Sequence, residues 1–142
     1  MFAIARSKNA NVVHYGVRLD RAGQLQKGEP VFAYWVLHAE DGRREELTWL
    51  ERELAYGWSI VSEQHPAGVT LRLTAFPNRS LLIRADNTGA HGAIVAIAGH
   101  DAVLSRIFVQ VDEGGLLPRV RYVELSGRDC KTQKAVKERL AP

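Results

Sequence analysis

The side chains best suited to bind a ligand lie in a polar cluster near the start of the 142-residue chain. The cluster contains two cations, Arg6 and Lys8, and two amides, Asn9 and Asn11, directly before a run of alternating apolar residues. Arginine and lysine donate charge-assisted hydrogen bonds to carboxylates and phosphates. Asparagine is also common where a strand begins, because its side chain bonds to its own backbone. The cluster therefore predicts either an anion-binding site or an ordinary turn.

Four more arginines lie in the middle of predicted strands, each on the face opposite the apolar residues of its strand. They are Arg72, Arg84, Arg106 and Arg121. On an inward face such side chains would line a cavity for a carboxylate or a phosphate. Arginine is rarely buried without a partner, so the pattern favours an exposed, solvated row.

One predicted strand carries an aromatic group, Tyr34 and Trp35, with His38 shortly after. Large aromatic side chains usually pack in a core, where a polar tip needs a hydrogen-bond partner, and this interpretation is the favoured one. The alternative is that the three side chains form the wall of a ligand pocket.

The sequence contains no recognisable catalytic or metal-binding motif. There is no G-x-S-x-G nucleophile elbow, and the single cysteine, Cys130, has no base near it in the sequence. The five histidines show neither H-E-x-x-H nor H-x-H spacing. We therefore expect no cofactor and no metal ion, and nothing in the motifs indicates an enzyme.

The composition is that of an ordinary globular protein, with 46% hydrophobic and 25% charged residues. One cysteine excludes an internal disulfide, and no apolar run reaches the roughly 20 residues that span a bilayer. The net charge of +3 is unevenly distributed, because residues 1–28 and 119–142 each carry +4 and the residues between them carry −5. Without a basic run or an RNA-binding signature, this charge does not predict nucleic-acid binding.

Alternating apolar residues bounded by turn residues predict about eight short strands. They cover residues 2–4, 13–19, 31–39, 69–75, 81–86, 93–98, 103–112 and 120–125. One helix is predicted over residues 48–56, where Thr48 and Glu51 form a capping box and Gly57 ends the helix. Its apolar face would contain Leu47, Leu50, Leu54 and Trp58. The charged tail, 131–140, fits a helix or an extended segment equally well.

Short turns between strands favour antiparallel neighbours in a single mostly β domain, residues 1–142. The predicted fold is an up-and-down antiparallel β-barrel of about eight strands with one packed α-helix, because closure removes exposed edges. The alternative is an open antiparallel sheet with the helix on one face. In the closed barrel the first and last strands pair, which would place Arg6 and Lys8 beside Arg119, Arg121 and Arg128.

Several segments of this sequence together resemble a bacterial family catalogued as a domain of unknown function, number forty-eight thirty-three. They are RSKNANVV (6–13), EP (29–30), AYWV (33–36), DGRREEL (41–47), LER (50–52), AYG (55–57), YVE (122–124) and GRD (127–129). The resemblance implies no particular activity, cofactor or catalytic residue. It implies export, which favours a protein whose leader has been removed over a cytoplasmic one. The first residues, Met1 to Ile4 and the polar run after them, have no signal-peptide pattern of their own.

We expect a non-enzymatic binding barrel for a small apolar or amphipathic ligand, with or without an anionic group. Apolar residues on both faces of 31–39 and the small residues Ala93, Ala96 and Ala98 motivate it, because small inward side chains leave space. One alternative is a packed structural or protein-interaction barrel of the bacterial envelope, and another is an enzyme with a polar site at one barrel mouth. The residues assigned to the ligand are Arg6, Lys8, Asn9, Asn11, Tyr34, Trp35, His38, Arg84, Arg106 and Arg121.

Overall fold

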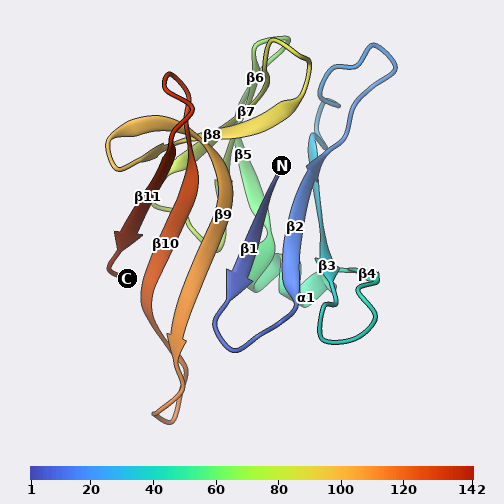
Figure 1. Cartoon of the computed structure of the whole chain (residues 1–142). Coiled ribbons are helices and arrows are strands. Elements are labelled where there is room, and N and C mark those ends of the chain that lie inside the picture. The colour runs from blue at the N-terminus through green and yellow to red at the C-terminus, as the bar shows by residue number, and fades with distance from the viewer.

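The computed structural model describes residues 1–142 as eleven strands and one short helical segment (Figure 1). In chain order the elements are β1 (Phe2–Arg6), β2 (Val12–Val17), β3 (Val31–Val36), β4 (Arg44–Glu46), α1 (Trp49–Glu51), η1 (Arg52–Tyr56), β5 (Trp58–Gln64), β6 (Gly68–Leu73), β7 (Ser80–Ala85), β8 (His91–Ile97), β9 (His100–Asp112), β10 (Arg119–Asp129) and β11 (Ala135–Leu140). The η1 segment is a π-helical turn.

The long strand β9 organises the sheet. Its first residues, 100–103, pair antiparallel with β8, and residues 106–109 pair in parallel with β1. Because β10 runs along the other edge of β9 over nearly its whole length, β8 and β1 leave β9 from the same edge. Two wings, β1–β4 and β5–β8, therefore diverge from one strand in the order β4-β3-β2-β1-β9-β8-β7-β6-β5.

The sheet curls strongly and stays open, as Figure 1 shows. The prediction of a mostly β protein is confirmed, and the open-sheet alternative fits, since β4 and β5 end the order without pairing to each other. The predicted neighbourhood of the first and last strands is wrong. β9 lies between β1 and β10 because β10 returns through a short turn and takes the free edge of β9.

The core fills the space between the two wings. Nineteen buried residues form one cluster, with Phe2, Val13 and Tyr15 from one wing and Leu71 and Ile83 from the other. Tyr15 stacks on Phe2, with ring centroids 4.6 Å apart. The three alanines expected to face inward and leave space lie in different environments. Ala93 is fully buried in this cluster, whereas Ala96 and Ala98 are exposed.

All eight predicted strands fall on strands of the structure, and three more were not predicted. β4 and β5 are exposed edge strands without a regular apolar alternation, and the tail forms β11, an extended partner of β10. β4 is exposed throughout and β5 over five of its seven residues, so neither strand has the one buried face that produces an alternating pattern. No helix has both the length and the apolar character that crossing a membrane would require.

The predicted capping box is confirmed. The Glu51 backbone N–H donates to Thr48 Oγ1 at 3.2 Å, and the Thr48 N–H donates to Glu51 Oε1 at 2.9 Å. The predicted buried face is wrong for two of its members, since Leu50 is 55% and Leu54 70% exposed. After one α-helical turn the chain continues as the wider π turn, which breaks the 3.6-residue period on which the face was predicted.

Gly57 ends the helical segment for a steric reason. Its backbone is extended rather than left-handed, but a Cβ at this position would collide with the carbonyl oxygen of Arg52. Because glycine has no Cβ, the chain passes from η1 directly into β5 without this collision. The position of Arg52 depends on that close approach.

Candidate functional site

A pocket of about 380 Å³ opens beside the β3–β4 edge, next to η1 and the start of β5. Its cationic lining consists of Arg18, Arg44 and Arg52, and its aromatic lining of Phe32, Tyr34 and Trp58. Ala33 and Leu47 complete the apolar part, and Glu45 and Glu46 bring two carboxylates. The pocket thus combines a positive rim with flat apolar walls.

The pocket exists because β4 is short. β4 has three residues and pairs only with residues 34–36 of β3, so the edge of β3 at residues 31–33 has no strand beside it. Phe32 and Tyr34 lie on one face of β3, as successive even positions of a strand do, and their rings stack with centroids 5.7 Å apart. This uncovered edge provides the aromatic floor.

Each pocket arginine lies over an aromatic ring. The guanidinium carbon is 5.3 Å from the Phe32 centroid for Arg18, 4.5 Å from Tyr34 for Arg44 and 5.2 Å from Trp58 for Arg52. These distances are typical of cation–π contacts. The contact holds the side chain in place and uses none of its five N–H donors.

None of the three pocket arginines forms an ion pair or a side-chain hydrogen bond within the protein, although neighbouring Arg43 does. Arg43 contacts Glu40 at 2.8 Å and Asp41 at 3.5 Å. Three cations face two carboxylates in the pocket, so its lining carries a net positive charge. Unused guanidinium donors beside aromatic faces are suited to an anion attached to a flat apolar group.

Two partly buried hydrogen bonds fix the helical segment against the sheet. Trp35 Nε1 donates to Glu51 Oε2 at 2.8 Å, and the buried Tyr15 hydroxyl donates to the Tyr56 carbonyl at 2.8 Å. Burial acts to raise the pKa of Glu51, but hydrogen bonds from Thr48 and Trp35 outweigh it and hold that pKa below its usual value. Burial raises the pKa of the Tyr15 hydroxyl far above its ordinary value, so it stays a neutral donor. Arg52 therefore projects from an anchored turn.

A family model described as "Domain of unknown function (DUF4833)" matches residues 2–139. The chain belongs to this family. The resemblance read from the sequence motifs is confirmed. No curated protein and no solved structure gives a match. Every residue that lines the pocket lies inside the DUF4833 match, so the pocket is part of this domain.

Of the ten residues assigned to a ligand from the sequence, the DUF4833 domain places one, Tyr34, in this pocket. Trp35, its neighbour, packs edge-on against Tyr56 at 5.2 Å and bonds to Glu51, in agreement with the packing interpretation. His38 is exposed in the loop after β3.

The polar cluster near the chain start lies elsewhere in the DUF4833 domain. Arg6 and Lys8 are exposed, and Lys8 Nζ lies 3.8 Å from a carboxylate oxygen of Glu113. The Asn9 side chain accepts a bond from the Asn11 N–H at 2.9 Å, and the Asn11 side chain accepts one from the Ala39 N–H at 3.0 Å. Both amide side chains thus accept hydrogen bonds from backbone N–H groups, Asn9 within its own turn and Asn11 from the loop after β3.

The remaining predicted arginines are dispersed over exposed positions. Arg106 lies over the Phe108 ring at 5.0 Å, Arg121 is on β10, and Arg84 lines a separate pocket of about 540 Å³ with His91 and Cys130. The exposed interpretation of the row agrees with these positions. The structure does not bring the ten residues together at one site.

The second pocket of the DUF4833 domain lacks an activated nucleophile. Burial raises the pKa of the Cys130 thiol, which keeps it protonated. Asp86 is engaged in its own turn, where it accepts bonds from Thr88 and Ala90. No group of three or more His, Cys, Asp or Glu side chains is arranged to hold a metal ion.

The pocket residues that the sequence did not indicate are Arg18, Arg44, Arg52, Phe32 and Trp58. They come from five separate elements or loops, and each alone looks like a surface cation or a core aromatic. The one local signal was the spacing of Phe32 and Tyr34, which places both rings on the same strand face.

Proposed function

We propose that this protein is a non-enzymatic binding protein whose pocket at the β3–β4 edge holds a small ligand with an anionic group beside a flat apolar part. One observation carries the proposal: three arginines without a protein partner, each over an aromatic ring, line a single pocket. The core between the wings is occupied by side chains, so the proposed ligand lies at the sheet edge and not in the interior.

The side chains that line the pocket fit both the anionic and the apolar part of the proposed ligand. Guanidinium groups bind carboxylate, sulfate or phosphate through paired N–H donors. The rings of Phe32, Tyr34 and Trp58 offer flat apolar surface, and a volume of about 380 Å³ suits a small molecule. Glu45 and Glu46 add acceptors for hydroxyl or amine groups at the rim.

A binding role is favoured over catalysis by the lining itself. It contains no serine, cysteine or histidine, the side chains that most often supply a nucleophile or a general base. Its two carboxylates, Glu45 and Glu46, are exposed to solvent. Nothing in the lining resembles a nucleophile oriented by a base.

Isothermal titration calorimetry with phenyl phosphate, inorganic phosphate and phenol tests the proposal. We expect phenyl phosphate to bind more tightly than either half alone, because it uses both the cations and the rings. Arg44→Gln with Arg52→Gln should weaken its binding by at least about tenfold, since each lost charge-assisted hydrogen bond is worth about 1.5–3 kcal/mol. Arg72→Gln is the matched control, an exposed β6 arginine with no ion pair and no place in this pocket.

Two results would overturn the proposal. One is equal binding by the double variant and the parent. The other is the absence of phenyl phosphate binding together with native mass spectra that show no retained small molecule.

A further inference from the structure

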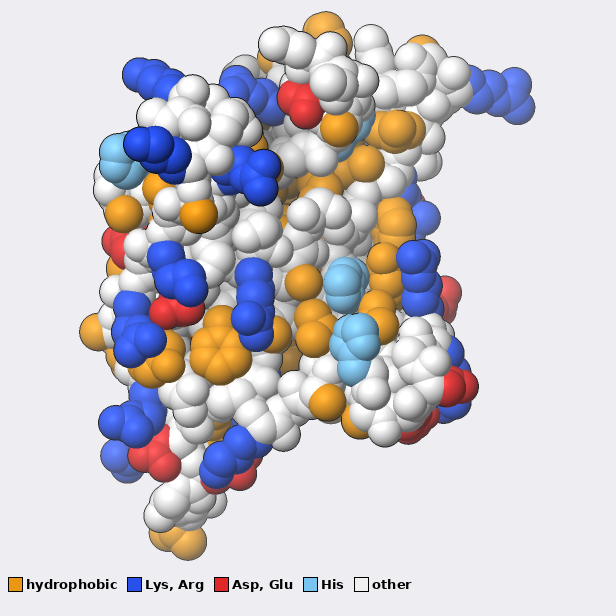
Figure 2. Space-filling view, in the orientation of Figure 1, with side chains coloured by type: hydrophobic (Ala, Val, Ile, Leu, Met, Phe, Trp, Pro, Cys, Tyr) orange, Lys and Arg blue, Asp and Glu red, His pale blue; other side chains and the backbone are white.

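The turn between β9 and β10 presents two neighbouring leucines directly to solvent. Leu116 is 104% and Leu117 75% exposed, between Gly115 and Pro118. In Figure 2 hydrophobic side chains form the outermost point of this hairpin. Single exposed leucines are common, but an adjacent pair at the end of a projecting hairpin has no packing role in the folded chain.

An apolar groove of about 230 Å³ adjoins this hairpin. Eight of its ten lining residues are hydrophobic, including Leu54 of η1 and Val120 of β10. Leu54 is 70% and Val120 41% exposed, so the groove is uncovered. We call Leu54, Leu116, Leu117 and Val120 the apolar end.

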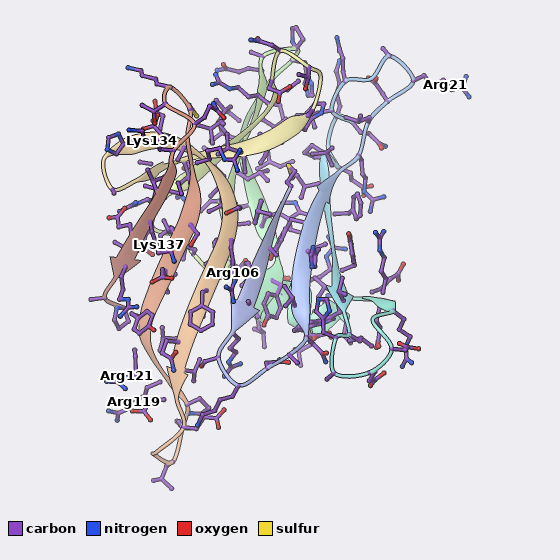
Figure 3. All side chains as sticks on the ribbon, viewed as in Figure 1. Arg21, Arg106, Arg119, Arg121, Lys134 and Lys137 are labelled. Atoms are coloured by element: carbon purple, nitrogen blue, oxygen red, sulfur yellow. The ribbon has the colours of Figure 1, made fainter.

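Cations surround the apolar end. Arg6 lines the groove, and Figure 3 shows Arg119 and Arg121 beside the end of the β9–β10 hairpin. Arg121 is the extra residue of a β-bulge, and neither Arg119 nor Arg121 has an ion-pair partner. Two carboxylates share the hairpin. Asp112 accepts a bond from the Gly114 N–H at 3.1 Å, and Glu113 lies 3.8 Å from Lys8. Arg6, Lys8, Arg119 and Arg121 outnumber these two carboxylates, so the charge around the apolar end is net positive.

We propose that the apolar end attaches this protein to the surface of an anionic lipid bilayer. Leu116 and Leu117 enter the headgroup region, and Arg119 and Arg121 bind the lipid phosphates around them. Exposed leucines gain from leaving water, and basic residues are attracted to an anionic leaflet. A second copy of the chain is disfavoured as the occupant, because two such ends would bring their unpaired arginines together.

Co-sedimentation with vesicles tests the attachment. The full chain should bind phosphatidylcholine vesicles that contain about a third phosphatidylglycerol, and bind pure phosphatidylcholine poorly. Leu116→Glu with Leu117→Glu should lower the partition coefficient at least about tenfold, because both insertion residues are lost. Arg119→Gln with Arg121→Gln should lower it about fivefold or more and should weaken its salt dependence.

Two controls separate this attachment from other effects. Ile60→Glu with Val61→Glu adds the same two charges at exposed positions on β5, 37% and 52% exposed, and should leave vesicle binding unchanged. The pocket variant Arg44→Gln with Arg52→Gln should also bind vesicles normally, so the two proposals can fail independently. Circular dichroism of each variant checks that the fold is intact.

Equal binding to neutral and anionic vesicles, or full binding by the double leucine variant, would overturn the proposal. So would light scattering that shows a dimer which the leucine variant converts to a monomer, because the apolar end would then serve a second copy of the chain.

Discussion

Arg79, in the turn before β7, and the three pocket arginines are held in opposite ways. Arg79 donates to both carboxylate oxygens of Glu138, at 2.7 and 2.8 Å, and to the Ala96 carbonyl at 2.5 Å. Glu138 also accepts the Ala98 N–H at 2.6 Å, so the pair ties β11 to the β5–β8 wing. The guanidinium groups of Arg18, Arg44 and Arg52 lie over aromatic rings and form no ion pair or side-chain hydrogen bond.

The difference separates structural arginines from those available to a ligand. A bidentate pair with added backbone bonds uses the donors of Arg79 within the fold. The hydrogen bond from Arg79 is the main cause that lowers the pKa of Glu138, to about 2, and the Ala98 N–H adds to it. A cation–π contact leaves every donor of the pocket arginines unused. Charge alone does not distinguish the two groups; their partners do.

The largest expected effect comes from Gly57→Ala, which disturbs the pocket from its backbone. The new Cβ collides with the carbonyl oxygen of Arg52, so η1 must move. We expect a loss of about 1–3 kcal/mol in the free energy of unfolding, measured by urea denaturation. Phenyl phosphate binding should weaken in parallel because Arg52 is displaced. An unchanged free energy of unfolding would contradict this prediction, because η1 would then accommodate the new Cβ at no cost.

Arg79→Ala should lower Tm by several degrees and leave phenyl phosphate binding unchanged. It removes three hydrogen bonds and leaves the Glu138 carboxylate without its main partner. Differential scanning calorimetry measures the effect. Glu138→Gln alone and together with Arg79→Ala complete a double-mutant cycle, which should show strong non-additivity. Additive effects would mean that the pair does not act as one unit.

Acid should weaken the same pair. The pKa of Glu138 lies near 2 in the folded chain against an ordinary value of 4.5. A lowered folded pKa contributes stability that is present above pH 4.5 and is lost as the pH falls toward 2. Urea midpoints measured across this range should therefore fall less steeply for Glu138→Gln than for the parent. Parallel curves would contradict the assignment.

The smallest stability effect should come from Arg44→Ala. Its guanidinium is exposed and has no hydrogen-bonded partner, so the free energy of unfolding should change by less than about 0.5 kcal/mol. Ligand binding should nevertheless weaken. A loss of stability comparable to that of Arg79→Ala would show that the Tyr34 contact is structural and would remove the contrast between the two groups.

Local sequence patterns predicted much of this fold. Alternation of apolar residues predicted eight strands, because side chains of a strand point to opposite faces in turn. Thr48 and Glu51 predicted the start of the helix, since a capping box involves only four consecutive residues. Arginines opposite apolar stripes predicted an exposed row, and Arg72, Arg84, Arg106 and Arg121 are all exposed. These features depend on neighbours within one element.

The pocket, in contrast, was decided by tertiary structure. It needs β4 to stop after three residues, η1 to widen into a π turn, and Arg18, Arg44 and Arg52 to meet around the free edge of β3. The parallel pairing of β1 with β9 was equally hidden, because it joins segments about a hundred residues apart. The periodicity of apolar residues indicates which face of an element is buried. It does not indicate which other element covers that face, or where the edge of a strand is left without a partner. Those outcomes depend on contacts between distant segments, and only the folded chain contains them.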